Sequence, residues 1–108
     1  MTAWRDSSSI FPNWGGYPEA DFEETMSEVE ASLFRAAADA LFSIYVIYKQ
    51  RGISTIKQGF EWWNLNRPET VETRRLNRVG YQKMLRVHWV LSAGGWRAVA
   101  EAFKEGKL

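Results

Sequence analysis

The sequence contains no cysteine and a single histidine, His88. The absence of cysteine excludes disulfide bonds, thiolate catalysis and zinc–thiolate sites, so stability must come from packing or from assembly. A histidine-based metal or acid–base site needs converging partner residues, and there is no second histidine to supply one. We therefore expect His88 to be a packed or hydrogen-bonded structural residue. The alternative interpretation makes His88 the ligand of a haem or a related pigment.

The chain also lacks the segments that mark membrane proteins, secreted proteins and nucleotide-binding enzymes. Its longest apolar run, residues 41–48, has eight residues and nearby charges, so no membrane span is expected. The N-terminus has no apolar stretch typical of a signal peptide, which favours a cytoplasmic or virion-contained protein over a secreted one. Neither Gly15–Gly16 nor Gly94–Gly95 has the spacing of a phosphate-binding loop. No nucleophile–base pair is evident, and we expect no catalytic residues, no metal and no cofactor.

Aromatic residues, by contrast, are abundant, at 15% of the sequence with six tryptophans. Aromatic side chains bury large areas, so a small domain can build a dense core or a contact surface from them. Several lie in residues 1–18, an aperiodic segment that we interpret as an extended N-terminal arm. We expect this arm to dock on its own domain or on a neighbouring molecule. Its apolar and aromatic residues are Trp4, Ile10, Phe11, Trp14 and Tyr17.

Residues 19–108 are expected to form a single helical domain. Pro18 and the acidic residues after it are typical of a helix start, and Gly52 is typical of a helix end. Between them, apolar residues that include Val29 and Leu33 recur at steps of three and four, the period of an α-helix. A β-strand over residues 41–48 is the competing interpretation, because that segment is rich in β-branched and aromatic residues.

Three further helices are expected. Residues 54–63 form a short helix, for which Ser54 is the expected cap. Residues 66–93 form a long helix that begins at an asparagine cap and is stopped by Gly94–Gly95, and residues 96–105 form a last short helix. The predicted fold is therefore all-α, a small bundle of two long and two short helices behind an aromatic-rich extended N-terminal arm.

Charge is unevenly distributed, although the net charge is only +1. Residues 1–30 carry one arginine and seven acidic residues, a net charge of −6. Residues 51–108 carry eleven basic and five acidic residues, a net charge of +6. Either the two halves neutralise each other, within the fold or between copies, or the basic half binds an anionic partner. Mutual neutralisation is the commoner arrangement and is the one that we expect.

The most specific pattern lies on the predicted long helix over residues 66–93. At about 100° per residue, several arginines fall on the face opposite the inner apolar stripe, and a tryptophan continues that face. Such a stripe can bind phosphate groups, lie solvated, or dock against carboxylates of a protein. Nucleic acid is the less favoured partner, because the net charge is near zero and no helix–turn–helix is apparent. The residues of this stripe are Arg75, Arg78, Gln82, Arg86 and Trp89, and Arg74 borders it.

Two adjacent tryptophans, Trp62 and Trp63, end the predicted short helix. Trp63 shares its face with Ile56 and Phe60, so we expect it in the core, whereas Trp62 points about 100° away. Either the short helix is enclosed and both rings are internal, or Trp62 belongs to an interface. Tryptophan and arginine are the usual energetic anchors of protein interfaces.

These patterns favour a non-enzymatic helical subunit that acts through protein–protein contacts in a larger or symmetric assembly, with a protein partner or a second copy. Small virion components and inhibitor proteins of phages provide an analogy at the level of class only. The residues expected to contact the partner are Trp4, Phe11, Trp14, Trp62, Arg86 and Trp89. One alternative is a cofactor- or pigment-binding protein with His88 as ligand. The other is a nucleic-acid-binding module that uses Arg74, Arg75, Arg78 and Arg86.

Overall fold

A computed structural model describes residues 16–108 of the chain. This range is helical, and its elements are the 3-10 helix η2 (Ala20–Glu23), α1 (Glu28–Arg51), α2 (Ile56–Asn66), α3 (Val71–Val79) and α4 (Tyr81–Lys104). The predicted all-α fold with two long and two short helices is confirmed. The β-strand alternative for residues 41–48 is wrong, because this segment lies within α1. Nearly all of the predicted arm, with Trp4, Phe11 and Trp14, lies outside the described residues.

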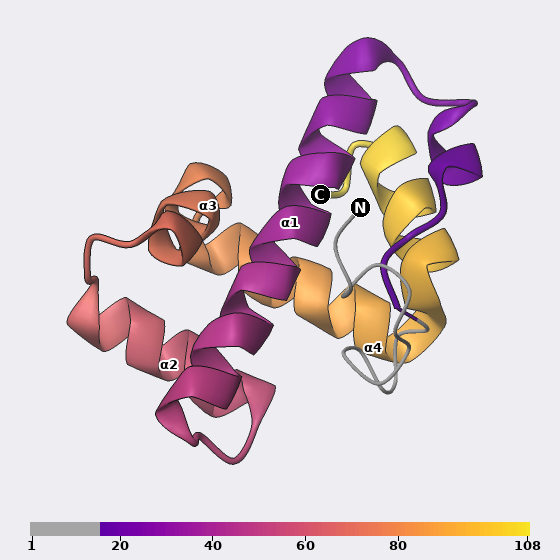
Figure 1. The fold of residues 1–108 in the computed structure, drawn as a ribbon. Helices are drawn as coiled ribbons and strands as arrows, with labels where there is room; N and C mark the ends of the chain where they lie inside the picture. Colours follow the sequence, from indigo (N-terminus) through magenta and orange to yellow (C-terminus); the bar gives the residue numbers. More distant parts are fainter. Residues whose placement is uncertain (1–15) are drawn as a thin grey trace.

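α1 is the central helix of the fold (Figure 1). In this view α2 and α3 lie to its left, while α4 passes behind it and then turns upward on its right. By length and composition α1 could cross a membrane, but the core helix of a soluble protein passes the same test, and 44% of that segment is buried. The expectation of no membrane span therefore stays a prediction.

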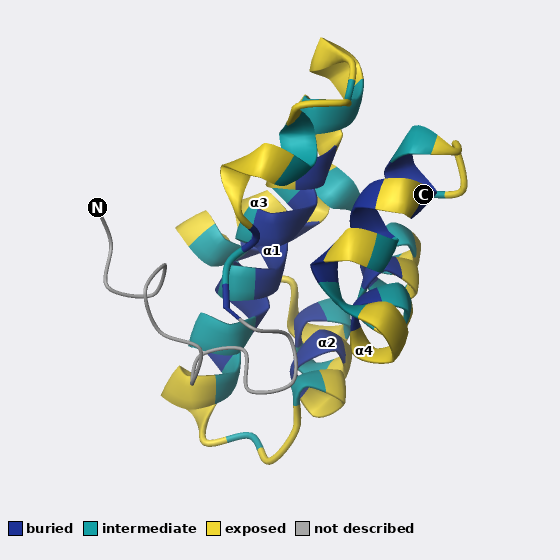
Figure 2. Ribbon diagram, turned by 90° about the vertical axis from the view of Figure 1, so that its right-hand side faces the viewer, coloured by how far each residue is buried: buried dark blue, intermediate teal, exposed yellow. Residues whose placement is uncertain are grey.

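One hydrophobic core joins the four α-helices, and the buried residues lie on the faces that these helices turn toward one another (Figure 2). Throughout residues 16–108, every buried side-chain nitrogen or oxygen has a hydrogen-bond partner. The core therefore carries no penalty for an unsatisfied polar group in this part of the chain. Its largest fully buried side chains are Trp63, Phe34, Phe60, Leu41 and Ile44.

The first long helix begins later than the proline pattern predicts. Ser27, not Pro18, precedes it: the Ser27 hydroxyl accepts a hydrogen bond from the Glu30 amide at 3.1 Å. The Glu30 carboxylate accepts one from the Ser27 amide at 2.9 Å, which completes a capping box. The acidic residues after Pro18 lie in and around η2 instead. They resemble a helix start, so the Ser27–Glu30 capping box was not recognised from the sequence. The caps of α2 and α3 also differ from prediction, since Thr55 and Thr70 fill these positions.

The prediction of one long helix over residues 66–93 is wrong, because the chain breaks at Gly80 between α3 and α4. Gly80 has φ 96° and ψ 150°, a conformation that is almost restricted to glycine. The apolar period gives no sign of the break, since Leu76 and Met84 on either side of it are both buried. The predicted stop at Gly94–Gly95 is confirmed as a kink inside α4, where Gly95 leaves the helical conformation with φ 74°.

Candidate interaction surfaces

Trp63, near the C-terminal end of α2, is a core residue, as predicted. Its indole N–H donates a hydrogen bond to Oδ1 of Asn77 on α3 at 3.0 Å. The Tyr81 ring lies with its centroid 5.5 Å away, and the Arg67 guanidinium lies 5.6 Å from the Trp63 ring centroid. Trp63 therefore holds α2 against the junction of α3 and α4, and it is not available to a partner.

Trp62 is half-buried at the edge of the core. The guanidinium of Arg51, at the end of α1, lies over its ring at 4.5 Å from the centroid, a distance typical of a cation–π contact. The nearby Gly59 faces Ile44 and Tyr48 of α1, so the space beside Trp62 is used by α1. Trp62 thus has a neighbour within its own chain, and its role in binding a partner stays a prediction.

The predicted arginine stripe is divided between two helices by the break at Gly80. Arg74, Arg75 and Arg78 are exposed on α3, whereas Arg86 and Trp89 are exposed on α4. None of the four arginines forms an ion pair with any residue of the range 16–108. The ion pairs found in this range are Arg35–Glu23, Lys104–Glu101 and Lys107–Glu105.

Within the described residues, no ion pair joins the acidic segment 16–30 to the basic segment 51–108. Arg35 belongs to α1 and pairs with Glu23 of η2, the element that directly precedes α1 in the chain. The other two pairs lie within the last residues of the chain. Neutralisation of the two halves, within the fold or between copies, stays a prediction.

Trp89 is the one tryptophan of the described range that is exposed, with 64% of its surface accessible. It lies on the outward face of α4, about one turn after Arg86. The neighbouring ring of His88 lies with its centroid 6.1 Å away, and no cation within residues 16–108 lies over the indole. Most of the Trp89 ring therefore faces solvent.

His88 is half-buried and packs edge-on against Phe60 of α2, with the ring centroids 5.5 Å apart. Burial lowers the pKa of His88 from its ordinary value of 6.5, because the charged form is poorly solvated there. These contacts fit the structural role predicted for His88. Over residues 16–108, no group of three histidine, aspartate or glutamate side chains is placed to hold a metal ion. The pigment-ligand alternative stays a prediction, and an absorbance spectrum with no band beyond that of tryptophan would contradict it.

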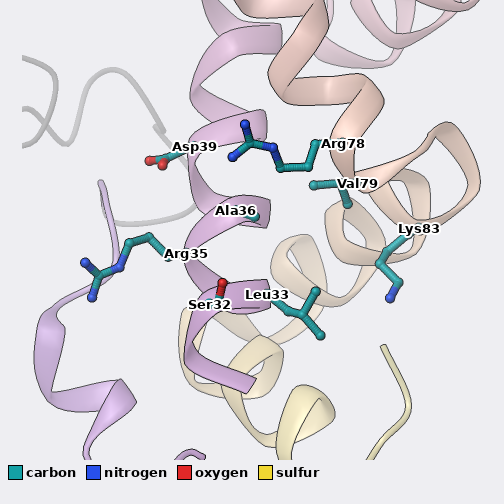
Figure 3. A pocket seen from close by; sticks show the side chains of 8 residues that line it. All are labelled: Ser32, Leu33, Arg35, Ala36, Asp39, Arg78, Val79 and Lys83. Atoms are coloured by element: carbon teal, nitrogen blue, oxygen red, sulfur yellow. The ribbon is translucent and has the colours of Figure 1, made fainter. Parts of the chain in front are cut away.

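A groove of about 330 Å³ lies between α1 and the junction of α3 and α4 (Figure 3). The Arg78 side chain extends from α3 over α1 toward Asp39, while Leu33 of α1 and Lys83 of α4 lie lower in the view. Sequence reasoning singled out Arg78 but missed the groove, because its two walls are distant in sequence. The lining residues are Ser32, Leu33, Arg35, Ala36, Asp39, Arg78, Val79 and Lys83.

The prediction that Val29 and Leu33 are buried on the inner face of the first helix is wrong. Their spacing placed both on the inner stripe of the first helix, yet they are 68% and 44% exposed. The chain turns away at Gly80, so α3 ends at Val79 beside Leu33 and extends no farther along α1. The apolar stripe of α1 is consequently left open at its N-terminal end.

No protein-family model matches this chain, and neither a curated protein nor a solved structure shows significant similarity to it.

Proposed function

We propose that this protein is a non-enzymatic helical subunit that works by binding another protein. The observation that carries the proposal is the exposure of Trp89, which stands out beside the buried Trp63 and Trp96. An exposed indole keeps a large apolar surface in water, and burial against a partner removes that surface favourably. Tryptophan is among the residues that most often dominate the binding energy of protein interfaces.

The surroundings of Trp89 support a protein contact. Arg86 is exposed on the same face of α4 and has no ion-pair partner within residues 16–108. Both residues lie on a regular helix, so they are held in place before a partner arrives. The partner is expected to offer an apolar pocket for the indole next to a carboxylate for the guanidinium.

The experiment is affinity capture from the native source with matched variants. Trp89→Ala is expected to lower recovery of the partner by about tenfold or more, as for a central interface anchor. Leu65→Ala is the matched control, because Leu65 is 81% exposed on α2. The proposal is wrong if Trp89→Ala recovers the partner as well as the wild type does, or if the wild type recovers none.

Nucleic-acid binding is the second candidate, favoured by the exposed arginines Arg74, Arg75 and Arg78, which lack ion pairs among the described residues. Fluorescence anisotropy with labelled single-stranded and double-stranded DNA and RNA tests it. True phosphate binding would weaken steeply as salt rises, and Arg78→Glu would abolish it. Absence of binding at low salt would exclude this candidate.

A further inference from the structure

The first turns of α1 present an apolar stripe that no other described element covers. Val29 and Leu33 continue the stripe on which Ala40 and Ile47 are buried farther along the same helix. Val79, the last residue of α3, lies at the groove beside Leu33, and the covering helix ends there. An apolar stripe left open on a regular helix is a typical site for contact with another molecule.

Charged residues of opposite sign lie at different positions along this open stripe. Arg78 and Lys83 line the groove and form no ion pair with any residue of the described range. Nearer the start of α1, Glu28 lines an adjoining hollow that shares Ser32 and Arg35 with the groove. Glu28 likewise has no ion pair within residues 16–108. Among the described residues, the surface therefore has the free carboxylate of Glu28 near the start of α1 and the free cations of Arg78 and Lys83 at the groove.

We propose that this surface binds a second copy of the chain in a two-fold symmetric contact, in which the two α1 helices pack antiparallel with Leu33 at the centre. A two-fold contact joins the same patch on both molecules, so the patch must complement itself when rotated by half a turn. In an antiparallel pair, a patch that is acidic at one end of the stripe and basic farther along it meets this requirement. The inference rests on the proposed role in protein assembly, but it uses a different face from that of Trp89.

The spacing along α1 brings the opposite charges together. Helical rise places Glu28 about 7.5 Å from Leu33 in one direction and Asp39 about 9 Å from it in the other. Arg78 lines the groove beside Asp39, so an antiparallel pair centred on Leu33 sets Glu28 of one copy opposite Arg78 of the other. Symmetry repeats this pairing on the far side of the contact.

Charge also argues for a second copy over other occupants. A strongly acidic protein or a nucleic acid would be attracted by Arg78 and Lys83 but repelled by Glu28 near the start of α1. A second copy places opposite charges together on both sides. The unpaired charges of this surface are thus neutralised between copies, in agreement with the charge asymmetry of the sequence.

Sedimentation equilibrium of the full chain over a wide concentration range tests the inference. The wild type is expected to show a reversible monomer–dimer equilibrium, and Leu33→Asp is expected to remain monomeric because it places two carboxylates at the centre. Arg78→Glu and Glu28→Arg are each expected to weaken dimerisation by about tenfold or more, since each change acts at two symmetric positions. The combined variant E28R/R78E restores opposite charges and is expected to recover most of the affinity.

Lys57→Glu on α2 is the matched charge-reversal control and is expected to leave dimerisation unchanged, because Lys57 is exposed away from the groove lining. Circular dichroism melting verifies that each variant is folded. A wild type that is monomeric at every concentration overturns the inference. A dimer that survives Leu33→Asp, or a combined variant no better than the single reversals, overturns it as well.

The inference and the proposed function can fail separately. If the wild type stays monomeric while capture still depends on Trp89, the second copy is excluded and the protein-binding role stands. If the dimer behaves as expected but capture does not depend on Trp89, the dimer contact stands and the role of Trp89 is wrong. A third outcome is that the wild type is monomeric, captures another protein, and loses that protein when Leu33 is changed to Asp. This outcome would assign the face to the other protein and overturn the inference.

Discussion

The apolar stripe of α1 is covered along the C-terminal half of the helix, but in the N-terminal half its first turns are left uncovered. In the C-terminal half, Ile44 is fully buried, with Gly59 of α2 packed against it. In the N-terminal half, Phe34 and Ala37 are buried, but Val29 and Leu33 of the first turns remain exposed. Because residue types and spacing are alike, the difference arises outside α1, where Gly80 turns the chain away after α3. Periodicity thus indicates which face of a helix is apolar, whereas the ends of neighbouring helices decide how much of that face is covered.

The largest expected effect separates the two halves directly. Ile44→Ala removes a fully buried side chain and is expected to lower the free energy of unfolding by about 2–5 kcal/mol. Leu33→Ala, in the uncovered half, is expected to change the free energy of the monomer by no more than about 0.5 kcal/mol. Urea unfolding at low protein concentration measures both values. Similar losses for the two variants would mean that the halves do not differ as described.

Gly80→Ala sharpens the comparison by altering the turn that leaves the stripe open. A non-glycine residue at φ 96° and ψ 150° is strained, so a loss of about 1–3 kcal/mol is expected. Urea unfolding gives the loss, and far-UV circular dichroism gives the helix content. A rise in helix content without loss of stability would show that α3 can extend along α1, against this account.

Ser27→Ala weakens the start of the uncovered half. It removes the hydroxyl that accepts the Glu30 amide hydrogen bond, and the expected loss is about 1 kcal/mol. Ser32→Ala is the control, because Ser32 is exposed within the same helix and has no capping bond. Thermal unfolding of the two variants side by side provides the check. Equal behaviour would argue against the capping box as the start of α1.

The smallest expected effect is a change with pH in the free energy of unfolding, which comes from the half-buried His88. Since burial lowers the pKa of His88 below 6.5, the unfolded state binds more protons than the folded state as pH falls through this range. The free energy of unfolding should therefore decrease as pH drops from above 6.5 through the lowered pKa, and level off below it. His88→Gln should remove this component, and the difference between the two urea-unfolding series isolates it. Parallel pH profiles would contradict the assignment.

The sequence predicts the fold class and much of the core because the spacing of apolar residues determines which face of each helix is buried. Trp63 is the clearest success, since its face was defined by its spacing from Ile56 and Phe60. The start of α1 was misplaced because acidic residues after Pro18 are compatible with both η2 and a helix start. The break at Gly80 was missed because the apolar period continues unchanged through it.

The candidate surfaces were less predictable than the core. Exposure of Arg78 and Trp89 follows from their positions opposite the apolar stripe, so sequence reasoning reached them. The groove beside Leu33 depends on where α3 ends relative to α1, which is a property of tertiary packing. Local patterns do not contain that information, because Leu33 and Val79 are far apart in the chain.

The most direct test of the central claim is a distance measurement between copies. The absence of cysteine allows a single spin label at Ser32→Cys, an exposed position next to Leu33 and close to the proposed two-fold axis. Pulsed electron paramagnetic resonance on the Ser32→Cys label should give one narrow, short distance between the two copies. Adding Leu33→Asp should remove this distance. A label at Lys57→Cys should give a longer distance. Absence of any defined distance for Ser32→Cys in a concentrated sample would contradict the claim that the uncovered half of α1 joins two copies.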